Sequence, residues 1–157
     1  MIAKERLVEI WNLNCRPHGH RSRTFVIAGD AYGQLLGRTT SNEIAEFNSW
    51  EDPAFDEALE LTRDLCPQTE KTGAPFQDVL GFVCDLSPGG RQYSFAGEIH
   101  CPECGTTEVE YGPDEPPEIR PMEVPQVSHR SWDNLTTSQK NQLLKEALIE
   151  KGWMEKS

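Results

Sequence analysis

The sequence predicts an α+β protein in which antiparallel β-hairpins are joined to a helical insertion and a C-terminal helix. Three observations lead to this prediction. Short β-prone runs flank two tight turns at residues 15–19 and 101–105. Apolar residues recur at helical spacing within 53–65 and again within 136–151. Because the chain of 157 residues is long enough for a hydrophobic core, we expect a single domain spanning residues 1–157.

The first hairpin is predicted on either side of the turn at residues 15–19. Residues 7–13 and 24–28 are rich in β-branched, aromatic and other large apolar side chains, which favours strands. Residues 34–36 can add a short third strand. We expect residues 41–47 to begin a short helix.

The clearest internal helix is predicted between Asp52 and Pro67. Asp52 can accept a hydrogen bond from the free N–H groups of the first turn, and Pro53 suits the first helical position. One face of this helix is mainly apolar and comprises Phe55, Ala58, Leu59, Thr62 and Leu65. The other face is acidic, so we expect an amphipathic helix that buries the first face.

The second half of the chain is predicted to repeat the strand–turn–strand organisation. Leu80, Phe82, Cys84 and Leu86 recur at every second position within residues 79–86, and turn residues follow at 87–90, which favours a strand and a tight turn. Residues 93–99 lead into the turn at 101–105, and residues 107–111 leave it as another alternating run. A helix also fits part of this region, on the spacing of Phe76, Val79, Leu80 and Val83.

The C-terminal third combines a proline-rich segment with a helix. Residues 112–125 hold five of the eleven prolines among acidic side chains, so we expect no central strand there but either an extended acidic surface strap or a partly ordered acidic arm. The final helix is predicted over about residues 136–151. Thr136 and Gln139 have capping-box spacing, and Gly152 ends the helix. Its buried stripe comprises Leu143, Leu144, Ala147 and Leu148.

Both tight turns carry residue types that bind metals. Cys15 and His18 are three positions apart, as are Cys101 and Cys104, and a glycine follows each pair. This spacing lets both ligands of a turn point at one ion, and the glycine lets the backbone reverse without a Cβ clash. Zn²⁺ prefers four tetrahedral sulfur and nitrogen ligands. We therefore predict a zinc site of Cys15, His18, Cys101 and Cys104, with His20 left open as the alternative to His18.

The turn around Cys101, Cys104 and Gly105 resembles a zinc-ribbon knuckle of the rubredoxin type. The resemblance covers residues 99–106 only and implies a metal site, without implying a function. Zinc ribbons usually pair two C-x-x-C turns, whereas here the partner turn is C-x-x-H. Four protein ligands make a closed site, so the expected Zn²⁺ is structural and clips the hairpins together. The alternative for this turn is a reduced or redox-active cysteine pair.

The formal net charge of −11 is concentrated in the middle of the chain. Residues 1–38 contain six basic and three acidic side chains, and residues 124–157 contain five and four. Residues 39–123 contain four basic and nineteen acidic side chains. Such a segment repels nucleic-acid phosphates and attracts a basic partner. The alternative is that these charges serve solubility alone.

The sequence also predicts a cytoplasmic location. No secretory signal or membrane-spanning apolar run is present. Three of the five cysteines are assigned to metal, and Cys66 and Cys84 are expected to be small buried side chains, which suits a reducing compartment. The sequence does not indicate an oligomeric state.

We therefore predict a non-catalytic, acidic, zinc-binding interaction protein with a basic protein partner. Its most concrete form is an immunity-type inhibitor that neutralises a basic toxin nuclease. One alternative is a zinc-ribbon module that binds nucleic acid or acts in transcription through Arg16, His20, Arg21 and Arg23. Another is a zinc-dependent hydrolytic enzyme in which water replaces one ligand. The sequence holds no phosphate-binding glycine loop, G-x-S-x-G elbow or H-E-x-x-H motif.

Overall fold

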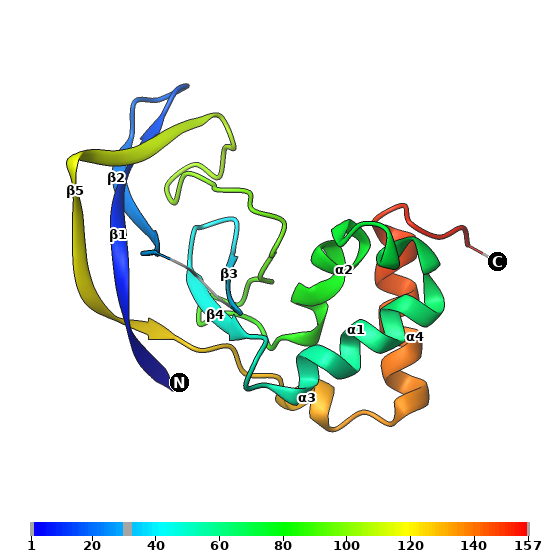
Figure 1. Ribbon diagram of the computed structural model, residues 1–157. Coiled ribbons are helices and arrows are strands. Elements are labelled where there is room, and N and C mark those ends of the chain that lie inside the picture. Colours follow the sequence, from blue (N-terminus) through cyan, green and yellow to red (C-terminus); the bar gives the residue numbers. More distant parts are fainter. Residues whose placement is uncertain (1, 30–32, 157) are drawn as a thin grey trace.

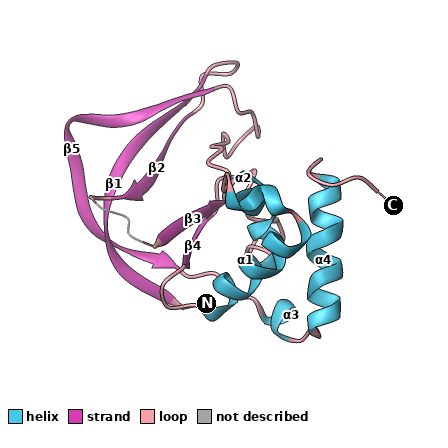
Figure 2. Cartoon of the chain, turned by 45° about the vertical axis from the view of Figure 1, so that its right-hand side comes forward, coloured by secondary structure: helices cyan, strands magenta, loops and turns pink. Residues whose placement is uncertain are grey.

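A computed structural model describes residues 2–29 and 33–156 of the chain. Strands gather on one side of the molecule and helices on the other, as Figures 1 and 2 show. The predicted α+β class, with antiparallel strands and a C-terminal helix, is confirmed.

The strands form two antiparallel sheets. The first has three strands in the order β2-β1-β5, namely β2 (Arg21–Ile27), β1 (Ala3–Cys15) and β5 (Val109–Pro125). The second pairs β3 (Gln34–Arg38) with β4 (Ile44–Asn48) and lies between the first sheet and the helices (Figure 1). The strands expected over 7–13, 24–28 and 34–36 are therefore confirmed, and the first is thirteen residues long.

On the other side of the β3-β4 sheet, the described part of the chain forms six helical elements (Figure 1). They are α1 (Pro53–Leu65), the 3₁₀ turn η1 (Pro67–Glu70), α2 (Ala74–Val79), the 3₁₀ turn η2 (Leu80–Val83), α3 (Arg130–Asp133) and α4 (Thr137–Glu150). Among the described residues, no helix combines the length and the apolar character needed to cross a membrane.

The two long helices begin as their sequences predict. The Asp52 side chain accepts a hydrogen bond from the backbone N–H of Ala54 over 3.0 Å at the start of α1. At the start of α4, Thr136 and Gln139 form a complete capping box. Because these caps satisfy N–H groups that have no partner inside the helix, they fix where each helix begins.

The helix expected over residues 41–47 is wrong, because this segment contains β4. Ala45, Glu46 and Phe47 are all buried. Successive side chains in a strand point to opposite faces, so Phe47 packs on the helices while Glu46 points to the first sheet. A strand can bury both faces between two layers, and a surface helix cannot.

The strand expected over residues 79–86 is also wrong, since α2 and η2 lie there. The four residues at helical spacing, Phe76, Val79, Leu80 and Val83, are all buried in the main core. Leu86, which belongs to the alternating set, is 61% exposed. Packing against the other helices therefore favours the helical pattern.

The strand expected over residues 93–99 is not formed. Within this segment only Ser94 makes a β-bridge, to Arg38. Tyr93, Phe95 and Ile99 are nevertheless buried. The alternating apolar residues of this segment are therefore buried against the core, although the segment is not paired in a sheet.

The proline-rich segment 112–125 belongs to β5, which pairs with β1 at an edge of the sheet. The pairing register shifts between Ile10 and Trp11, whose partners are Glu118 and Pro113. Residues 114–117 therefore leave the ladder as a bulge. This agrees with the prediction that the prolines exclude a central strand, because an edge strand tolerates missing N–H groups.

The larger hydrophobic core lies between the β3-β4 sheet and the helices. Its fully buried members include Phe47, Trp132, Leu80, Leu144 and Leu148. A smaller cluster between the two sheets contains Val8, Ile10 and Val124, with Leu36 of β3 packed against it. Each layer is thus joined to the next by apolar contact.

Polar contacts join the two sheets as well. Arg6 of β1 donates two hydrogen bonds of 2.9 Å to the fully buried carboxylate of Glu46 in β4. From β3, Arg38 donates to the Thr24 hydroxyl and the Phe25 carbonyl of β2, each over 2.6 Å. Burial lowers the pKa of Arg38 to about 10, because removal from water disfavours the charged form.

We predict that Arg6→Met lowers the free energy of unfolding by about 3 kcal/mol, because it leaves a buried carboxylate without its counter-charge. Urea unfolding of the chain with the same metal content measures this change. Arg120→Met is the control, since Arg120 is an exposed arginine whose partner is also a glutamate, Glu118 at 3.5 Å. Equal effects of the two substitutions would contradict a special role for the buried pair.

Candidate metal centre

Four side chains from the two tight turns converge at one place. The ligand atoms of Cys15, His20, Cys101 and Cys104 all lie within 4.8 Å of one another. The Sγ atoms of Cys15 and Cys104 are 3.5 Å apart, and the Cys101 Sγ is 3.5 Å from the His20 Nδ1. Three sulfurs and one nitrogen at this separation match the donor set that Zn²⁺ prefers, so this group could hold a metal ion.

The pairing of β1 with β5 brings the two turns together. Cys15 is the last residue of β1 and faces Val109, the first residue of β5. The N–H of Arg16 continues the pairing by donating to the carbonyl of Glu108 over 3.0 Å. The first turn follows β1 and the second precedes β5, so antiparallel pairing places them side by side.

Both turns have the same backbone geometry. In each, the glycine N–H donates to the carbonyl of the first cysteine, Cys15 or Cys101, over 2.8 Å. The N–H of that cysteine donates to the residue five positions later over 2.9 Å. The glycines, Gly19 and Gly105, have φ of 68° and 76°, a region that favours glycine. The first turn therefore has the hydrogen-bonding pattern of the knuckle that the second turn resembles.

The histidine in the four-residue group is His20 and not His18. The His18 Nδ1 lies 3.9 Å from the Cys15 Sγ, and its ring stacks on that of His20 with the centroids 5.3 Å apart. The Nε2 of His20, on the opposite side of the ring from its Nδ1, is 3.3 Å from a carboxylate oxygen of Glu103. A carboxylate on the outer nitrogen is the usual partner of a metal-binding histidine. Glu103 would thus orient His20 toward an ion, and its sequence position alone does not indicate this contact.

The electrostatics of the turn favour a thiolate at one cysteine. Burial raises the pKa of Cys101, but the backbone N–H groups of Cys104 and Glu103 and the His20 side chain lower it to about 7 overall. The backbone N–H of Thr106 lowers the pKa of Cys104, yet the neighbouring thiols leave it raised. Since metals bind thiolates, Cys101 offers a ready ligand near neutral pH.

The other two cysteines lie away from this site. Cys66 and Cys84 are both buried in the larger core. Burial raises the pKa of Cys84, so its thiol stays neutral. Both behave as the small buried side chains that the sequence analysis expected.

A second group of titratable side chains connects α1 with α3. His129 Nε2 is 2.8 Å from an oxygen of Asp52, and its Nδ1 is 2.9 Å from an oxygen of Asp133. Partial burial lowers the pKa of His129, but the two carboxylates raise it above its ordinary value overall. The sequence gives only the i,i+4 spacing of His129 and Asp133, whereas Asp52 and His129 are 77 positions apart.

A comparison of the chain with protein-family models, with curated proteins and with solved structures finds no match.

We predict that His20→Ala lowers Zn²⁺ affinity by more than the roughly 10–100-fold typical of losing an outer partner of a ligand. His18→Ala is the matched control and should change the affinity little, because His18 is not in the four-residue group. Competition with a chromophoric chelator measures both affinities. The reverse order of effects would make His18 the ligand.

We also predict that His129 stabilises the fold in a pH-dependent way. Its folded pKa is raised, so its contribution is complete below the ordinary value of about 6.5 and is lost as pH rises through the folded value. Urea unfolding of the chain and of His129→Gln at about pH 6 and about pH 9 measures the difference. The metal site is the same in both chains, so its contribution cancels when the stability of His129→Gln is subtracted from that of the unaltered chain at each pH. A difference that stays constant between the two pH values would contradict the prediction.

Proposed function

We propose that the chain is a non-catalytic binding protein, held by a structural Zn²⁺ ion, that docks on a basic protein partner. Four protein ligands fill a tetrahedral site and leave no position for a reacting water. Cys15, His20, Cys101 and Cys104 supply that number. The donor count therefore supports a structural role for the ion.

The position of the metal site also supports this role. Residues 84–108, between η2 and β5, contain no helix or strand and one isolated bridge, at Ser94. An ion held by Cys101 and Cys104 would tie the end of this segment to the end of β1. Such a tie removes conformational freedom from the unfolded chain, so metal binding contributes directly to folding.

The observation that carries the binding proposal is a large set of unpaired acidic side chains. Within residues 2–29 and 33–156, several exposed carboxylates have no hydrogen bond or ion pair through their side chains: Glu5, Asp56, Glu60, Asp64, Glu70, Glu108, Glu115 and Glu123. Most belong to the segment with nineteen acidic and four basic residues. A surface of this kind accelerates encounter with a positively charged partner.

Two of the three arginines on the first turn and β2 are paired with carboxylates of β5, which supports a protein partner over nucleic acid. Arg16 lies 3.3 Å from Glu110, and Arg23 lies 3.3 Å from Glu118. Their charges are thus already balanced by β5, which reduces their value as phosphate contacts. In its most concrete form, the proposal is an immunity-type inhibitor whose carboxylates cover the phosphate-binding surface of a basic toxin nuclease.

The test uses the zinc-loaded chain as bait in a lysate of its source cell, with an unrelated protein of similar net charge as the control. A captured protein is identified, purified and assayed for nuclease activity with and without the chain. We expect a basic protein whose association rate constant falls at least about tenfold from low to high ionic strength. Capture of no basic protein, or an association rate independent of salt, would refute the binding proposal. Unchanged nuclease activity would refute only the inhibitor form.

A further inference from the structure

Within residues 2–29 and 33–156, no other part of the chain covers one face of the three-stranded sheet. Val8, Ile10 and Val124 point inward, toward β3 and β4, and are buried. Their neighbours along each strand point to the opposite face. Figure 1 shows that this face of β2, β1 and β5 lies away from the helices. We call it the outer sheet face and define it by Glu5, Leu7, Glu9, Val26, Ile119, Pro121 and Glu123.

Apolar side chains on the outer sheet face flank Glu9, whose carboxylate accepts a hydrogen bond from Trp11 Nε1 over 2.9 Å. Leu7 is 58% exposed and Ile119 is 54% exposed. Leu7 pairs with Pro121, and Glu9 pairs with both Ile119 on β5 and Val26 on β2, so these side chains lie in neighbouring rows. Scattered exposed apolar residues are ordinary, whereas adjacent ones on one sheet face mark a contact surface.

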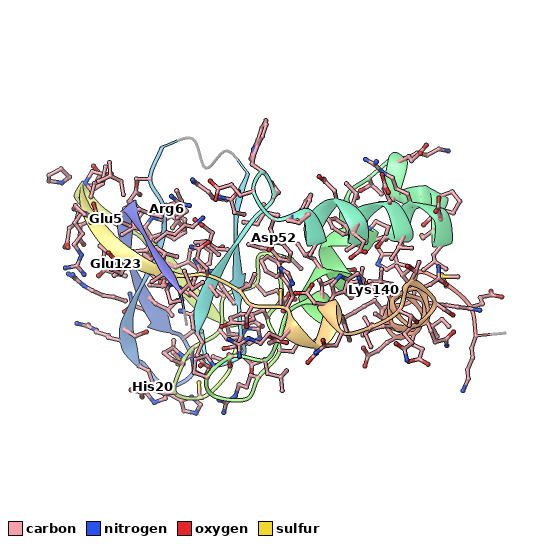
Figure 3. The ribbon with its side chains drawn as sticks, turned by 90° about the horizontal axis from the view of Figure 1, so that it is seen from below. Glu5, Arg6, His20, Asp52, Glu123 and Lys140 are labelled. Atoms are coloured by element: carbon pink, nitrogen blue, oxygen red, sulfur yellow. The ribbon has the colours of Figure 1, made fainter. Side chains whose placement is uncertain are left out.

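One end of the outer sheet face carries two opposed carboxylates. Glu5 of β1 and Glu123 of β5 are direct cross-strand partners, and both are exposed. Like charges in directly opposite positions destabilise a sheet. Within the described part of the chain, neither carboxylate has an ion pair or a hydrogen bond. Figure 3 shows both on the side of the sheet away from the helices. By contrast, the adjacent Arg6 bonds to Glu46.

We propose that the outer sheet face is the docking surface for the basic partner, an inference that rests on the proposed function. The exposed side chains of Leu7, Ile119 and Pro121 pack on an apolar patch of the partner, and one lysine or arginine beside that patch lies between Glu5 and Glu123. A second copy of the chain does not fit, because it would bring together two acidic faces of chains that each carry −11.

The first experiment locates the contact by photocrosslinking. In one variant, Leu7 is replaced by p-benzoylphenylalanine. In the control variant, the same replacement is made at Leu86, which is 61% exposed on another part of the surface. Both chains are irradiated with the purified basic protein captured by the unaltered chain. We expect an adduct from position 7 and none from position 86.

The second experiment separates charge from apolar contact. Glu5→Gln with Glu123→Gln should lower the association rate constant about 3–10-fold at low salt, while raising the melting temperature of the free chain, because the repulsion is removed. The control pair Glu60→Gln with Asp64→Asn on α1 removes the same charge, and it should change neither the association rate constant nor the melting temperature. Leu7→Thr with Ile119→Thr should raise the dissociation rate constant about tenfold, and Leu86→Thr should leave it unchanged.

The outcomes distinguish this inference from the function on which it rests. If the unaltered chain binds a basic protein but position 7 gives no adduct and the face variants bind normally, the outer sheet face is not the docking surface and the proposed function stands. If the unaltered chain captures no basic protein, both proposals are wrong. If a variant loses binding and also loses its metal or its melting transition, the loss of binding is due to misfolding. In that case Glu5→Gln alone, which changes one exposed side chain, tests the docking surface: a lower association rate constant supports it and an unchanged one refutes it.

Discussion

The antiparallel pairing of β1 with β5 is the constraint on which the rest of the structure depends. It joins the first residues of the chain to the segment after the second turn, and it places Cys15 beside Val109. Cys15 and Cys104 are 89 positions apart in sequence but 3.5 Å apart at their sulfurs. A metal ion at this site would therefore fasten a junction that the strand pairing has already made.

Buried charged side chains join the two sheets and fix how one sheet lies against the other. The Arg6–Glu46 pair and the buried Arg38 cross from one sheet to the other. Each needs its partner at hydrogen-bonding distance, because an isolated buried charge is costly. The sheets are consequently held at one register and orientation, which a purely apolar interface would specify less strictly.

The sequence predicted elements whose signals are local. Asp52 and Thr136 start helices through hydrogen bonds to residues two or three positions away, and both starts are found in the structure. Residues 44–48 and 79–83 were misassigned because burial by distant layers decides between helix and strand there. The metal group was predicted from spacing in three of its four members, and spacing alone could not tell His20 from His18. The contact of His129 with Asp133 is local, four positions along the chain, but its contact with Asp52 was not predictable because tertiary packing brings that carboxylate to it.

The prolines of β5 have a consequence for how the molecule behaves in a crowded solution. An open sheet edge is a template on which further chains can add strands and grow into fibres. Five of the seventeen residues of β5 lack the N–H that such growth needs, and four residues bulge out of the ladder. The chain can therefore leave apolar side chains uncovered on the face of its sheet while its long edge resists aggregation.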